Sequence, residues 1–308
     1  MRKGRRYVLK TACGFAVVCL ILAAVSSCGR GSKGPKELGK TVIQNVGSDT
    51  MVNLAQEWAD AYRLVDPTVS VEVSGGGSGV GIASLINGTV DIANASRPLK
   101  DKEKEEVRDN TGKEAVEHIV AYDAVTIYVH KDNPIEEISI EDLREIFAEG
   151  GTITKWSQLG VKNRQDTIVV VSRQNNSGTY FFFREHVLNK RDFRMGALKL
   201  SGSKDVVELV GRTPGAIGYS GLGYFDPKLV KALKVALKKG GPAYPPSLQT
   251  VREGKYPLAR PLYMYTLGEP TGAVKKYLDW ILSPEGQKIV LKVGYVPVAA
   301  VGGGAFGR

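Results

Sequence analysis

The chain contains little cysteine and little histidine, and neither type is placed for metal chemistry. Only three residues are cysteine, and all three lie within the first 28 residues. The rest of the chain therefore offers no disulfide, no thiolate nucleophile and no cysteine ligand for a metal. The three histidines are scattered and lack the spacing of a metal-binding motif; they are His118, His130 and His186. We expect neither a metal site nor another cofactor.

Excess charge is also small once the N-terminus is set aside. The formal charge is +10, but residues 1–27 carry five cations and no acid, so the remainder carries +5. This excess suits an anionic ligand and is too small to indicate nucleic-acid binding. Hydrophobic residues make up 43% and charged residues 24% of the 308 residues. Both the balance and the length are typical of a globular protein of about two domains.

Residues 1–27 have the three parts of a signal peptide. A basic stretch at 1–10 precedes the apolar run TACGFAVVCLILAAV at 11–25, and small residues follow it. The apolar run is shorter than the ~20 residues of a membrane-spanning helix. The segment from Val25 to Cys28 resembles a bacterial lipobox, which implies cleavage before Cys28 and a lipid on its sulfur. An uncleaved membrane anchor is the alternative, and both predict export.

The segments around this signal do not distinguish between two export routes, but they predict where the mature protein is located. Arg5 to Lys10 loosely resembles a twin-arginine export signal, so general secretory and twin-arginine export are both possible routes. Residues 28–40 are rich in glycine and lysine, a composition typical of a flexible tether between lipid and domain. We expect a monomer that is lipid-anchored to a membrane, either in a periplasm or at a cell surface.

Short apolar, β-branched runs alternate with helical patterns along the rest of the chain. This alternation predicts an α/β fold with mostly parallel sheets flanked by helices. The predicted strands are 41–46, 69–73, 90–94, 123–129, 167–171, 215–219 and 260–265. The predicted helices are 50–64, 79–87, 101–109, 140–148, 178–188, 204–211, 271–282 and 284–292.

Three predicted strand-to-helix junctions carry similar ligand chemistry. A helix N-terminus offers unpaired N–H groups and a positive dipole end, where an anion binds well. Serine and threonine hydroxyls add donors, and an arginine fork matches two oxygens of a tetrahedral anion. The candidates are Ser48, Asp49, Thr50 and Met51 in the first junction, Ser78 in the second, and Arg173, Ser177, Gly178 and Thr179 in the third. A fourth segment after a strand adds Ser96 and Arg97.

Each junction alone has an ordinary interpretation. Ser48 is a good helix cap, Gly75 to Gly81 could form any tight turn, and Arg173 could form a surface ion pair. The glycine run departs from the dinucleotide pattern G-x-G-x-x-G at its last position. Since ligands in open α/β sheets bind beyond the carboxyl ends of strands, the joint occurrence predicts one shared oxyanion site.

These segments resemble the phosphate-binding proteins of bacterial phosphate-specific ABC transporters. The resemblance implies two lobes that close on inorganic phosphate, and delivery to the transporter's permease subunits. It divides the chain into lobe I, residues 41–122 with 260–308, and lobe II, residues 123–259. It carries ligand roles onto Thr50, Ser78, Arg173, Ser177, Gly178 and Thr179, with Ser48 and the N–H of Met51 as further candidates. The similar segments are Gly47–Met51, Gly75–Ile82, Thr89–Leu99, Arg173–Thr179, Pro214–Tyr219, Ser283–Gly286 and Gly294–Pro297.

The sequence departs from the family at Ser96, where well-known members have an aspartate that accepts the proton of bound phosphate. Asp49 is one candidate for a replacement acceptor; the alternative is an acid favoured by the start of a helix. Arg97 is either a second cation on the anion or a neighbour of Asp49.

Two other functions stay open. The same scaffold could bind sulfate or molybdate, since a site without a proton acceptor does not repel an ion that has no proton to donate. An enzyme acting on phosphoesters would need metal ligands or an activated nucleophile. The serine-hydrolase pattern G-x-S-x-G is absent around Ser78, because Val80 occupies its last position. We therefore expect a binding protein rather than an enzyme.

Overall fold

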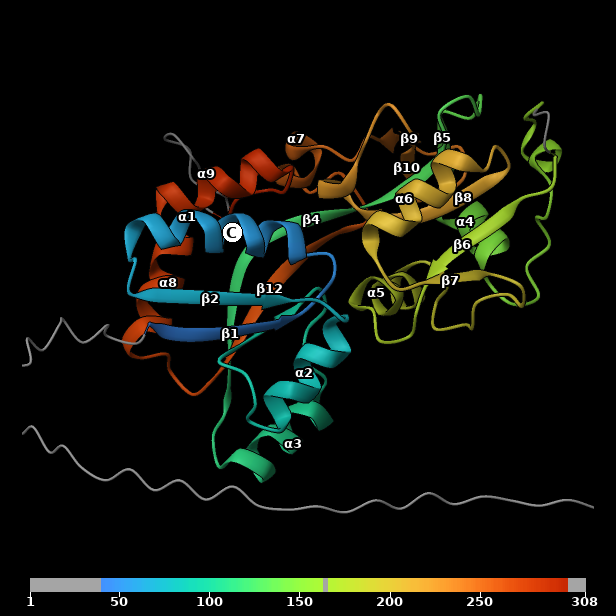
Figure 1. The fold of residues 1–308 in the computed structure, drawn as a ribbon. Helices are drawn as coiled ribbons and strands as arrows, with labels where there is room; N and C mark the ends of the chain where they lie inside the picture. Colours follow the sequence, from blue (N-terminus) through green and yellow to red (C-terminus); the bar gives the residue numbers. More distant parts are fainter. Residues whose placement is uncertain (1–39, 163–165, 299–308) are drawn as a thin grey trace, which may run out of the picture. The chain divides into compact units, whose positions relative to one another are not determined.

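The computed structural model of this protein describes residues 40–162 and 166–298. The predicted signal peptide, Cys28, all of the predicted tether but its last residue, and residues 299–308 lie outside the described residues. Within the two described ranges, no helix is long and apolar enough to cross a lipid bilayer. Helices and strands alternate along the chain (Figure 1).

The main sheet has nine strands in the described part of the chain, in the order β2-β1-β3-β12-β4-β8-β6-β7, with β9 paired to β4. Its strands are β1 (Thr41–Gly47), β2 (Val69–Ser74), β3 (Ile92–Ala95), β4 (Ala115–His130), β6 (Val169–Arg173), β7 (Leu198–Leu200), β8 (Ala216–Gly221), β9 (Val230–Ala232) and β12 (Ala259–Leu267). A second sheet joins β5 (Glu137–Ser139), β10 (Lys234–Ala236) and β11 (Ala243–Tyr244).

Lobe I is built on both faces of β1, β2, β3 and the paired parts of β4 and β12. Successive residues of a strand point to opposite faces, so each face carries its own core. One core contains Ile43, Trp58 and Met264, and the other contains Ile82, Leu85 and Tyr265. The first face is covered by α1 (Val52–Val65), α8 (Gly272–Leu282) and α9 (Pro284–Val293), and the second by α2 (Ser78–Ile86) and α3 (Asp101–Thr111) (Figure 1).

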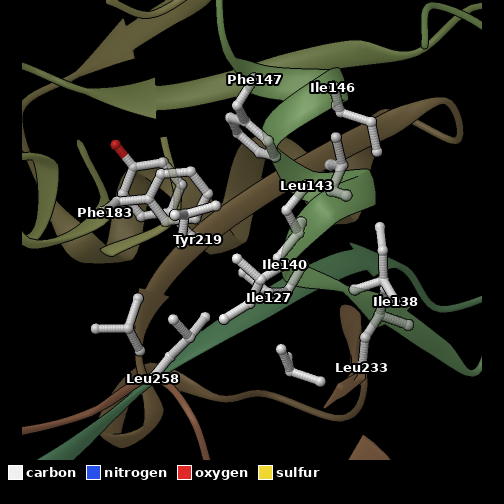
Figure 2. Packing of buried hydrophobic residues seen from close by; sticks show 14 of the residues in the cluster. Ile127, Ile138, Ile140, Leu143, Ile146, Phe147, Phe183, Tyr219, Leu233 and Leu258 are labelled. Carbon is white, nitrogen blue, oxygen red and sulfur yellow. The ribbon is translucent and has the colours of Figure 1, made fainter. Parts of the chain in front are cut away.

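Lobe II packs its largest core around the aromatic rings of Phe147, Phe183 and Tyr219. The rings of Phe183 and Tyr219 are stacked with centroids 4.0 Å apart, and Phe147 lies 4.9 Å from Phe183. Figure 2 shows Leu143 and Phe147 together with these two rings and with Ile127 of β4. The helices of this lobe are α4 (Ile140–Phe147), α5 (Gly178–His186), α6 (Ser203–Arg212) and α7 (Leu248–Arg252).

Strand β4 belongs to both lobes because it changes partner along its length. Residues 115–124 pair with β12, and residues 125–129 pair with β8. The change lies next to the predicted first boundary at residue 123. The division into 41–122 with 260–308 and 123–259 stays a prediction.

The two-lobed fold with flanking helices is as predicted, but the sheet is mixed rather than mostly parallel. Parallel pairs lie inside each lobe, between β1 and its neighbours β2 and β3 and between β6 and its neighbours β7 and β8. Antiparallel pairs involve β4 and β12, which carry the chain between the lobes in opposite directions. All seven predicted strands and eight predicted helices have counterparts. The first half of β4 and the short elements β5, β7, β9, β10, β11 and α7 were not predicted from the sequence.

Candidate functional site

The three predicted junctions and the fourth segment meet in one place, at the ends of β1, β2, β3 and β6 and the starts of α1, α2 and α5. Side-chain bonds join them directly. Ser48 Oγ donates to Ser96 Oγ over 3.0 Å, and Ser96 N donates to Ser78 Oγ over 3.0 Å. Thr50 Oγ1 and Thr179 Oγ1 are 2.8 Å apart, which links the first junction to the third. The predicted convergence of these junctions is therefore present in the structure.

The five hydroxyl residues form what we call the hydroxyl cluster: Ser48, Thr50, Ser78, Ser96 and Thr179. Each of them is only 0–1% exposed. Since buried hydroxyls are costly without partners, they bond to one another here. A hydroxyl donates one proton and can rotate to a new acceptor. The cluster is thus a buried set of donors that could turn toward an anion.

The start of α5 packs tightly against this cluster. A Cβ added at Gly178 would lie 2.5 Å from Ser96 Oγ and closer still to Ser78 Oγ, so only glycine fits there without a shift. Ser177 caps the helix, because its Oγ accepts from Thr179 N at 3.2 Å and from Tyr180 N at 3.3 Å. The capped N-terminus of α5 therefore lies next to the hydroxyl cluster.

Arg173 ends β6 and is completely buried. Its Nη1 donates to Ser203 Oγ at 2.9 Å, its Nη2 to Asp49 Oδ2 at 3.1 Å and to the carbonyl of Ser201, and its Nε to the carbonyl of Leu200 at 3.3 Å. Burial lowers the pKa of the guanidinium, and Asp49 opposes that shift. The predicted anion-binding arginine therefore bridges the two lobes through an ion pair with Asp49.

Asp49 is held from three directions rather than solvated as a simple helix-start acid. Its Oδ1 accepts from Gly76 N at 2.9 Å, and its Oδ2 accepts from Arg173. Its carbonyl oxygen accepts from the hydroxyl of Tyr224 at 2.6 Å. Burial raises the pKa of Tyr224 to about 12, so this hydroxyl remains a donor at neutral pH. The carboxylate has a fixed position beside Thr50.

Two of the predicted ligands have other partners. Arg97 forms a two-point ion pair with Glu103 of α3, with both N–O distances 2.7 Å, and its guanidinium lies 5.2 Å from the ring of Phe181. It is therefore neither joined to the hydroxyl cluster nor paired with Asp49. The N–H of Met51 donates to the carbonyl of Ser48 at 2.9 Å, so the turn itself uses this group.

Sequence reasoning missed Arg260 and Asp123, which form the most buried ion pair at the site. Their side chains are 2% and 0% exposed, and Arg260 Nη2 lies 2.9 Å from Asp123 Oδ2. The same Nη2 donates to Thr179 Oγ1 at 2.9 Å and to Thr50 Oγ1 at 3.3 Å. Each residue is the first of a predicted strand that is otherwise largely apolar. Two opposite charges at the starts of two apolar strands were the sequence signal that could have indicated this ion pair.

The charges at the site cancel in pairs. Arg173 is paired with Asp49, Arg260 with Asp123, and Arg97 with Glu103. An anion would therefore be held mainly by hydroxyl and N–H donors and by helix N-termini, not by an unpaired cation. In the described ranges, no group of three or more His, Cys, Asp or Glu side chains is arranged to hold a metal ion.

A cavity of about 370 Å³ opens beside the Asp49–Arg173 pair. It is lined from lobe I by Asp49 and Val52, and from lobe II by Ser203 and Tyr224. The cavity therefore lies where the two lobes meet, on the side of Asp49, and the hydroxyl cluster does not line it.

Comparison with known proteins gives one consistent result. A family model described as a PBP superfamily domain matches residues 33–285. Phosphate-binding protein PstS of Pseudomonas aeruginosa is 33% identical over 270 residues, covering 84% of this chain and 83% of the relative. Phosphate-binding protein PstS of Bacillus subtilis is 32% identical over 292 residues, covering 92% and 91%.

Solved structures agree with these relatives. A substrate-binding protein with bound phosphate, attributed to a phosphate ABC transporter of Clostridium perfringens, has a TM-score of 0.73 at 32% identity and covers 84% of this chain and 100% of its own. An ABC-type phosphate transport receptor from Vibrio cholerae has a TM-score of 0.65 at 27% identity, with coverages of 82% and 99%.

Proposed function

Since the chain belongs to the phosphate-binding proteins of the PBP superfamily, we propose that it binds inorganic phosphate between its lobes and delivers it to an ABC-type phosphate importer. The observation that carries this proposal is the hydroxyl cluster at the N-terminus of α5, next to Arg173. The ligand would contact Thr50, Ser78, Ser96, Gly178 and Thr179, with Ser48, Ser177 and Arg173 adjoining.

Burial of the site supports a free oxyanion rather than a phosphate ester. Ser78 and Thr179 are both completely buried, and Gly178 leaves no room for a methyl group. The organic part of an ester would have to displace these elements. A tetrahedral ion would need only the hydroxyls to exchange their mutual bonds for bonds to oxygen.

Calorimetric titration of the full chain in mild detergent tests the function. After removal of bound ligand, we expect phosphate to bind in the micromolar range or tighter. Sulfate and molybdate should bind at least about tenfold more weakly, because neither ion has a proton to donate to a carboxylate in the site. Sulfate or molybdate binding as tightly as phosphate would instead mean that Ser96 marks a change of ligand.

We further propose that Asp49 is the acceptor for the phosphate proton. Oδ1 accepts one hydrogen bond from Gly76 N and Oδ2 accepts one from Arg173, which leaves lone pairs on both oxygens for a P–OH donor beside Thr50. Asp49→Asn should weaken phosphate binding about tenfold and narrow the difference from sulfate, since the carboxylate that repels sulfate is gone.

The control for this substitution is Asp91→Asn, on a lobe I carboxylate that accepts from Gln44 N at 2.8 Å, away from the cluster. Asp91→Asn should leave both affinities unchanged. If Asp49→Asn also leaves the phosphate-to-sulfate ratio unchanged, Asp49 is not the acceptor.

The relatives are transport binding proteins, and we propose that this chain likewise performs no chemistry. Turnover of simple phosphoesters by the purified protein would contradict this proposal.

The relatives belong to transporters, and we propose that this chain acts as an exported monomer held to the membrane by a lipid on Cys28. Release of the protein from the membrane fraction by Cys28→Ala would support the anchor.

We propose the lobes to be residues 41–122 with 260–308 and residues 123–259. The change of partner along β4 supports a hinge where the chain crosses near residues 123 and 259. Phosphate can drive closure only if it binds the closed arrangement more tightly than the open one. Thr50 and Thr179 support this proposal, because their hydroxyl oxygens lie 2.8 Å apart across the lobe boundary and an anion bound to both would favour the closed arrangement.

A further inference from the structure

Arg260 connects the hinge of the molecule to the hydroxyl cluster. It lies directly opposite Asp123 in the antiparallel pairing of β12 with β4, at the crossing between the lobes. Asp123 accepts from its Nε at 3.2 Å and from its Nη2 at 2.9 Å. The other oxygen of Asp123 accepts from Leu222 N at 3.0 Å, so the carboxylate is fixed from two sides.

The guanidinium reaches both lobes at once. From lobe I, Nη1 donates to the carbonyl of Ser96 at 3.0 Å and Nη2 to Thr50 Oγ1 at 3.3 Å. From lobe II, Thr179 Oγ1 accepts from Nη2 at 2.9 Å, and the ring of Phe182 lies 5.3 Å from the guanidinium carbon. The planar guanidinium can reach all of these acceptors if one Nη2 proton is directed to Asp123 and the other is shared between Thr179 and Thr50, whereas a lysine ammonium has only three donors at one point.

Counting protons shows what these bonds do to the threonines. Thr50 Oγ1 and Thr179 Oγ1 each accept from Arg260, and each has a single proton to donate. In the Thr50–Thr179 bond one proton is used, and the other hydroxyl must donate away from the cation. When the two oxygens no longer bond to each other, both protons point away from Arg260.

We propose that Arg260 is a positioning residue for anion binding. It occupies the acceptor sides of the Thr50 and Thr179 hydroxyls, so that their protons are presented to the anion as the lobes close. Asp123 neutralises the charge of Arg260 and holds its guanidinium against the two threonines rather than against the anion. This inference rests on the function proposed above, because it needs an anion between Thr50 and Thr179.

A double-mutant cycle separates this role from a merely structural one. The variants are Arg260→Lys, the pair Thr50→Val with Thr179→Val, and all three together, each titrated with phosphate as the full chain in detergent. Valine keeps the threonine shape and removes the hydroxyl. Arg194→Lys is the matched control, since Arg194 is a partly buried lobe II arginine that donates to the carbonyls of Glu145 and Gly151.

We expect Arg260→Lys to weaken phosphate binding about tenfold to a hundredfold in the native background. In the valine background the same substitution should cost less than about threefold, because there are no hydroxyls left to orient. Arg194→Lys should leave phosphate affinity unchanged. Melting of the ligand-free variants shows whether they are folded.

Other results overturn the inference. An equal loss in both backgrounds would mean that Arg260 acts on the anion directly or on the fold, and an unchanged affinity would mean that it has no role. If Arg260→Lys does not fold, the double variant Asp123→Asn with Arg260→Gln removes both charges together. It then replaces Arg260→Lys in the titrations of the native and valine backgrounds. The wild-type titration tests the proposed function separately: if only sulfate binds, the cycle is run with sulfate, and if no oxyanion binds, both proposals fall.

Discussion

Arg173→Lys is expected to weaken phosphate binding at least about a hundredfold. The arginine makes four bonds from three nitrogens, and these set the position of Asp49 and of the segment that contains Ser201 and Ser203. A lysine keeps the charge but has a single donor point, so it cannot hold both lobes and also serve an anion. Calorimetry with phosphate gives the loss directly.

Arg97→Lys provides the comparison for this expectation. Arg173 ends a strand, Arg97 follows one, and both are buried, but Arg97 is bonded to Glu103 and lies over Phe181. We expect Arg97→Lys to change phosphate affinity by less than about threefold, because Arg97 is bonded to Glu103 and not to the hydroxyl cluster. A large loss for Arg97→Lys together with a small loss for Arg173→Lys would reverse the assignment of the two residues.

Gly178→Ala should also weaken phosphate binding, by about tenfold to a hundredfold. The added methyl would meet Ser78 Oγ and Ser96 Oγ across the lobe boundary, well inside contact distance. Relief requires either a rotation of both hydroxyls away from the site or a small separation of α5 from lobe I. Both changes remove donors from an anion, and titration with phosphate measures the effect.

The ligand-free stability of this variant distinguishes a local effect from unfolding. Alanine is favoured over glycine inside a helix, so the helix itself should not be weakened. Glu185→Ala places a second alanine in α5, at a residue whose ion pairs are longer than 3.6 Å, and should leave affinity unchanged. If Gly178→Ala binds phosphate as tightly as the wild type, the packing of α5 on the hydroxyl cluster does not control the site.

The parts that could be predicted from sequence are those that depend on neighbours along the chain. Helix periodicity, β-branched runs and the glycine–hydroxyl junctions are local patterns, and they located the main elements and the hydroxyl cluster. The partner of Arg97 depends on which of several acids in the run from Lys100 to Arg108 faces it, and helix geometry selects Glu103.

The residues that were missed depend on pairing between distant strands. Arg260 and Asp123 meet because β12 and β4 are antiparallel in one particular register, and a shift of one residue would separate them. The antiparallel direction also explains why the sheet is mixed. The ion pair of Asp49 with Arg173 likewise needs both lobes in place before either residue has its partner.

Lobe I combines the first strands of the domain with β12, α8 and α9 from its end, and this arrangement affects the order of folding. The core that holds Ile43 and Trp58 near the start of the domain is completed by Tyr277, Ile281 and Val290 near its end. The first strands to emerge during synthesis or export therefore have no finished core to join until almost the whole chain is available. If lobe II is the one continuous stretch proposed above, it can assemble earlier, and the core of lobe I is completed later by long-range contacts.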